Sequence, residues 1–101
     1  MESTHRSDYL DKLQPSLRQW SDQIDGFERQ LRSARKKQNV RNYEYRLMEL
    51  RARQAELERR LRECENEDDA AWEGLRMALD DTVRLFKDAF ERASKTFKEL
   101  V

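Results

Sequence analysis

The chain has 101 residues, of which 37% are apolar and 42% charged, so it can form one domain at most, with a thin core. Its 21 basic and 21 acidic residues cancel, which excludes a uniformly basic nucleic-acid-binding protein. Two Gly, one Pro and long runs of Leu, Arg, Glu, Gln, Lys and Ala predict an all-helical protein.

The first residues show no apolar periodicity. Residues 1–7 are expected to form a disordered tail, which contains the only histidine, His5. Ser7 can cap a helix that begins at Asp8. Pro15 predicts a kink or a later start for that helix, because proline lacks a backbone N–H.

From Leu10 to Cys64, apolar residues recur mainly at spacings of three and four, which indicates helix. The phase slips in the middle: Leu31 and Leu47 are 16 residues apart, which rotates the two apolar stripes by about 160°. The favoured interpretation is one helix over residues 8–65 that changes partner at its middle, with kinks near 15 and 35–41. The alternative is a turn at 35–41, supported by Asn39 and Asn42, and a monomeric three-helix bundle. The absence of Gly and Pro from this segment favours continuity.

The segment after Cys64 is acidic and breaks the periodicity, which predicts a turn at residues 66–69 and a second helix over 70–100. This coiled-coil hairpin, part of a single domain over residues 8–101, leaves the first apolar stripe uncovered. Covering it with a second copy predicts an antiparallel homodimer. The expected self-association residues are Leu17, Trp20, Ile24, Phe27 and Leu31.

Charge is unevenly distributed along the chain. Residues 28–62 hold 12 basic and 5 acidic residues, whereas residues 63–81 hold 1 and 8. The candidate anion or nucleic-acid patch consists of Arg32, Arg35, Lys36, Lys37 and Arg41. Such a patch can contact phosphates of nucleic acid or of an anionic membrane surface, but no aromatic residue lies within it, and a solvated helix face is the simpler interpretation.

Nothing in the sequence indicates catalysis. One His, one Cys and no Gly-rich phosphate loop leave no nucleophile–base pair, so no catalytic residue, metal site or cofactor is expected. Cys64 lies on the apolar stripe, which favours a buried thiol in a reducing compartment. Without a signal-peptide pattern or a membrane-spanning run, a cytoplasmic location is expected.

Several motifs resemble a widespread group of small bacterial coiled-coil proteins over about residues 8–98. The matching positions are Tyr9, Leu13, Leu17, Trp20, Ile24-Asp25, Tyr43-x-x-x-Leu47-x-x-Leu50, Leu57, Leu61 and Ala71-Trp72-Glu73-x-Leu75. The chain departs from the pattern at Pro15 and from Gln38 to Asn42. Some members are labelled stress-response proteins and most have no assigned activity, so the resemblance implies no catalytic residues.

These observations predict a non-enzymatic, self-associating coiled-coil protein with a structural or interaction role, and the resemblance adds a stress association. One alternative is an adaptor for nucleic acid or an anionic membrane surface that uses the basic segment. Another is a holdase that shields client proteins with the apolar stripe of the first helix.

Overall fold

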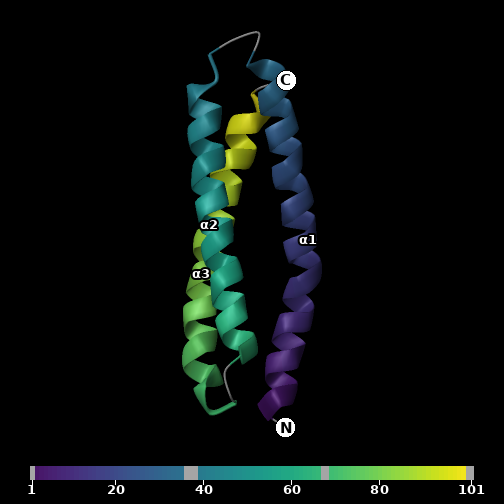
Figure 1. Ribbon diagram of the computed structural model, residues 1–101, viewed down its shortest axis with the longest axis vertical. Coiled ribbons are helices and arrows are strands. Elements are labelled where there is room, and N and C mark those ends of the chain that lie inside the picture. Colours follow the sequence, from purple (N-terminus) through teal and green to yellow (C-terminus); the bar gives the residue numbers. More distant parts are fainter. Residues whose placement is uncertain (1, 36–38, 67–68, 100–101) are drawn as a thin grey trace.

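The computed structural model describes residues 2–35, 39–66 and 69–99. These residues form α1 (Glu2–Ala34), α2 (Arg41–Asn66), a short 3₁₀ turn η1 (Asp69–Ala71) and α3 (Trp72–Lys98). The predicted all-helical class is confirmed for this part of the chain. The helices lie side by side along a 55 Å axis, with α1 and α3 running in one direction and α2 in the other (Figure 1).

The favoured prediction of one helix over residues 8–65 needs correction, because two helices occupy this range. The Oδ1 atom of Asn39 accepts a hydrogen bond from the backbone N–H of Arg41 at 3.1 Å. This bond satisfies one of the unpaired donors at the start of α2 and favours a new helix at that point. The remainder of the predicted turn, residues 36–38, lies outside the described residues.

The N-terminal segment also differs from the prediction. α1 begins at Glu2, within the expected tail, and continues through Pro15 as one element. No Gly or Pro precedes Pro15, so nothing in the local sequence stops the helix from extending backwards. Pro15 remains a weak point, because it removes one backbone hydrogen bond from the interior of α1.

The core is a single apolar cluster with contributions from all three helices. α3 contributes most because its apolar residues recur at helical spacing. The buried apolar side chains of α3 are Trp72, Leu79, Val83, Phe86, Ala89, Ala93 and Phe97. α2 adds Leu50, Leu57, Leu61 and Cys64, and α1 adds Ile24, Leu31 and Ala34. Val40, just before α2, closes one end of the cluster.

The seams between helices differ in width. α2 and α3 approach closely along their lengths, whereas α1 stands further from both (Figure 1). Large rings span the wider distance: the ring centroids of Trp20 and Phe86 are 5.0 Å apart, and those of Phe27 and Phe97 are 4.7 Å apart. Aromatic pairs at these distances contribute about 0.5–1.5 kcal/mol each beyond the area they bury. The rings therefore attach α1 to α3.

Each seam also carries a polar contact. Arg51 of α2 lies 3.3 Å from Asp25 and 2.7 Å from Glu28 of α1. Arg92 of α3 lies 3.2 Å from Glu49 of α2. The Tyr9 hydroxyl of α1 donates a hydrogen bond to Asp80 of α3. These contacts connect every pair of helices.

Replacing the proline inside α1 should stabilise the protein. Pro15→Ala restores a backbone donor at an exposed position, so the free energy of unfolding should rise by about 1–3 kcal/mol. Urea denaturation followed by circular dichroism measures the change. Gln14→Ala, at the neighbouring exposed position, should change stability by less than about 0.5 kcal/mol. Equal effects of the two substitutions would contradict an uninterrupted α1.

Tyr9 should make the free energy of unfolding depend on pH in the alkaline range. Burial, and secondarily the hydrogen bond to Asp80, raise the pKa of the Tyr9 hydroxyl above its usual value of 10.0. The folded chain holds this proton more tightly than the unfolded chain. The contribution of Tyr9 to the free energy of unfolding is therefore complete below about pH 10 and falls as the pH rises further. The difference in unfolding free energy between wild type and Tyr9→Phe should therefore shrink above pH 10. Parallel pH curves for the two proteins would disprove the coupling.

Candidate functional site

The residues predicted to form the self-association stripe lie inside the chain. Ile24 is 0% exposed and Leu31 is 1% exposed. Trp20 packs on Phe86, and Leu17 is half-buried against the core. α2 and α3 of the same chain cover much of this apolar surface, but Leu17, Trp20 and Phe27 remain partly exposed. Self-association through this stripe stays a prediction.

A charge placed at Ile24 should unfold the chain. Ile24→Asp buries a carboxylate without a partner, so the free energy of unfolding should fall by more than about 3 kcal/mol. The matched change at the exposed Gln19, Gln19→Asp, should cost less than about 0.5 kcal/mol. Chemical denaturation at one protein concentration compares them. A mild effect at Ile24 would show that α1 does not pack against its own chain.

The predicted basic patch is only partly described, because Lys36 and Lys37 lie outside the described residues. Arg32 pairs with Glu28 at 3.3 Å within α1. Arg35 pairs with Glu44 at 3.5 Å across the start of α2. Arg41 is exposed and forms the first turn of α2. The structure therefore gives the Arg32 and Arg35 guanidinium groups carboxylate partners in the chain itself.

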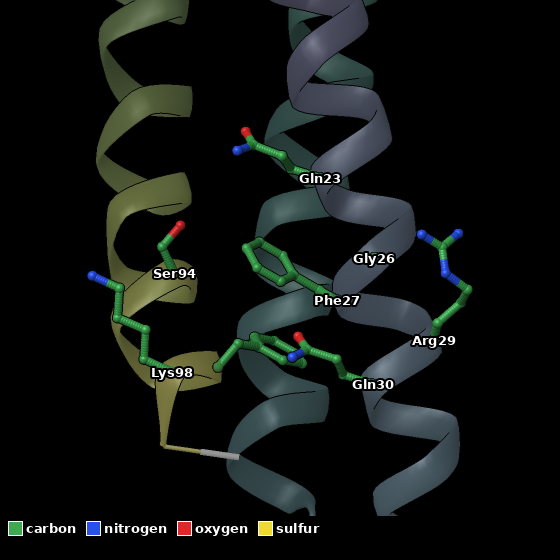
Figure 2. Close-up of a pocket in the computed structure, with 8 residues that line it drawn as sticks. Gln23, Gly26, Phe27, Arg29, Gln30, Ser94 and Lys98 are labelled. Carbon is green, nitrogen blue, oxygen red and sulfur yellow. The ribbon is translucent and has the colours of Figure 1, made fainter. Parts of the chain in front are cut away.

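A groove of about 630 Å³ lies between α1 and α3, near their C-terminal ends. Phe27 projects from α1 toward α3, and its ring stacks on that of Phe97 with an angle of 17° between the ring planes (Figure 2). Gly26 leaves space beside Phe27, because a Cβ atom there would come no closer than 3.8 Å to the Arg29 guanidinium. The groove therefore has an aromatic floor and an open side.

The polar groups around this groove come from both helices. They are Gln23, Arg29 and Gln30 of α1 and Ser94 and Lys98 of α3. No carboxylate is among the residues that line the groove, whereas Arg29 and Lys98 border it, and Figure 2 shows the Arg29 guanidinium turned away from α3. The sequence did not indicate this groove, because it forms only where α1 lies beside α3. The available signal was Gly26 next to Phe27, a position without a side chain beside a large ring.

A second surface lies on the outer side of α2. Tyr45 is 56% exposed, Met48 is 64% exposed, and Ala52 and Ala55 are also exposed. Their spacings of three, four and three residues place them on one face of the helix, which we call the α2 strip. The sequence analysis missed it because Tyr43, Leu47 and Leu50 define a stronger stripe on the opposite face. The spacing of Met48, Ala52 and Ala55 was the available signal.

The charges beside the α2 strip differ at its two ends. Glu44 and Arg62 are 18 residues apart, which is five helical turns, so both lie on the same flank of the strip. Arg62 is exposed and makes no ion pair with a described residue. One flank of the strip therefore begins at the Glu44 carboxylate, which also pairs with Arg35 of its own chain, and ends at the positive charge of Arg62.

The described residues offer little for other chemistry. Among them, no group of three His, Cys, Asp or Glu residues is arranged to hold a metal ion. Cys64, the single cysteine, is buried. None of the described helices combines the length and apolarity needed to cross a membrane. No protein-family model, curated protein or solved structure matches the chain.

Proposed function

We propose that this protein is a non-enzymatic, self-associating helical interaction protein, and that two copies pair through the α2 strip. The observation that carries the proposal is the exposure of Tyr45, Met48, Ala52 and Ala55 at helical spacing on one face. Each copy would be a three-helix bundle that covers much of the stripe of α1 itself. The resemblance to small bacterial coiled-coil proteins supports an interaction role, including a stress-associated one.

The sequence of α2 favours an antiparallel pairing about its centre. A two-fold axis between Arg53 and Gln54 brings Ala52 opposite the partner's Ala55 and Met48 opposite the partner's Arg59. Two small side chains at the crossing point let the helix axes approach to about 8 Å. The aliphatic stem of Arg59 can cover Met48 while its guanidinium stays in water. The strip therefore fits a copy of itself.

Charge selects the antiparallel direction over the parallel one. In the antiparallel register Glu44 lies within one residue, about 1.5 Å along the axis, of the partner's Arg62, and symmetry repeats this pair. In a parallel pair one flank of a helix faces the opposite flank of its partner, so Glu44 and the partner's Arg62 would not meet and this pairing of opposite charges would be lost. Opposite charges at the flanks of paired helices set orientation in this way.

Charge reversal at this flank tests the proposal. Glu44→Arg and Arg62→Glu each place like charges together at both flank pairs, so each variant should be monomeric, with the chain mass of 12.3 kDa. Mixing the two variants should produce a heterodimer, because every flank pair then joins opposite charges. The wild type and the double variant should both form homodimers. Sedimentation equilibrium up to about 1 mM measures the masses, since one helix face gives only a weak dimer.

The control carries the same charge changes on another helix. Asp81 and Arg84 form an exposed ion pair on α3 at 2.8 Å. Asp81→Arg and Arg84→Glu should leave the dimer intact. A wild type that stays at the mass of one chain at about 1 mM overturns the proposal. A mixture of the two α2 variants that stays monomeric overturns it as well.

A further inference from the structure

We propose that the groove between α1 and α3 binds a small aromatic anion, with its ring system on Phe27 and its anionic group beside Lys98. The proposal is independent of pairing through α2. It rests on the shape of the groove, the aromatic stack that forms its floor, and the kind of polar groups around it (Figure 2).

The volume of the groove and its aromatic floor fit a planar apolar ring system. The groove of about 630 Å³ falls within the range of roughly 300–1,000 Å³ that is typical of small-molecule sites. Phe97 is 1% exposed and holds the ring of Phe27 from one side at a centroid distance of 4.7 Å. Phe27 is itself only half-buried, so part of its ring remains accessible from the groove. Phe90 also packs on the Phe27 ring, with centroids 5.8 Å apart, so a ligand ring can contact the part of Phe27 that Phe97 and Phe90 leave accessible.

The polar groups select a negative charge. Arg29 lies on the α1 side of the groove and Lys98 on the α3 side, and neither forms an ion pair with a described residue. Figure 2 shows the Arg29 guanidinium on the side of α1 away from α3, so it does not face a ligand stacked on Phe27. Lys98, with its flexible stem, is the cation of the groove that remains available to an external anion.

Neutral donors complement this charge. The side chains of Gln23, Gln30 and Ser94 line the groove and make no hydrogen bond with the described part of the chain. Amide and hydroxyl groups can donate to a carboxylate at the same time as an ammonium group does. A ligand with one aromatic body and one carboxylate would thus engage both the floor and the rim.

Titration with 2-naphthoate tests the inference, and the cation 2-naphthylmethylammonium serves as the matched probe of opposite charge. Amide chemical shifts should change for residues of the groove with 2-naphthoate, and much less with the cation. Lys98→Glu should weaken binding of 2-naphthoate at least about fivefold. Lys95→Glu makes the same charge change outside the groove and should leave the affinity within about twofold.

A second variant blocks the site without touching the core. Gly26→Leu adds a side chain at the open side of the groove, where a Cβ atom is accommodated, and it raises helix propensity. It should abolish the chemical-shift changes while the circular dichroism spectrum stays unchanged. Equal binding of the two naphthyl probes overturns the proposal. Shift changes located outside the groove, or an equal loss of affinity in Lys95→Glu, overturn it too.

Discussion

The aromatic contact between α1 and α3 is the interaction on which the arrangement of this protein depends. Among the α1 side chains that the structure describes, three are buried: Ile24, Leu31 and Ala34. Trp20 and Phe27 add large aromatic contacts to this attachment by packing on Phe86 and Phe97. Rings of this size hold the helices further apart than alanine does, and the α1–α3 groove lies in this wider seam.

Polar contacts define which helix lies beside which. Exposed ion pairs add at most about 1 kcal/mol each, so they contribute less to stability than the rings do. Their main effect is to favour one arrangement of the three helices over others. Arg51 reaches Asp25 and Glu28 only when α1 folds back along α2, and a collinear helix would leave all three groups apart. Tyr9 with Asp80 then fixes the other end of α1 on α3.

The sequence predicts which segments are helical better than it predicts where one helix ends and the next begins. Apolar spacing identifies the buried face of α3, because Phe86, Ala93 and Phe97 recur with the period of a helix. The change of phase between Leu31 and Leu47 fits two structures equally, a helix that changes partner and a chain that turns. In the structure α1 ends at Ala34 and α2 begins at Arg41, where Asn39 accepts a hydrogen bond from the Arg41 N–H, and a single side-chain bond is invisible to periodicity. The groove could not be predicted, because it depends on α1 and α3 being neighbours.

The α2 strip and the α1–α3 groove face in opposite directions. Leu50 is buried and lies about 180° around α2 from the centre of the α2 strip, so the strip points away from the core. The groove belongs to the α1–α3 seam, on the other side of that core. A second copy seated on α2 therefore leaves the groove open. The proposed second copy and the proposed aromatic anion would therefore contact different residues and would not compete.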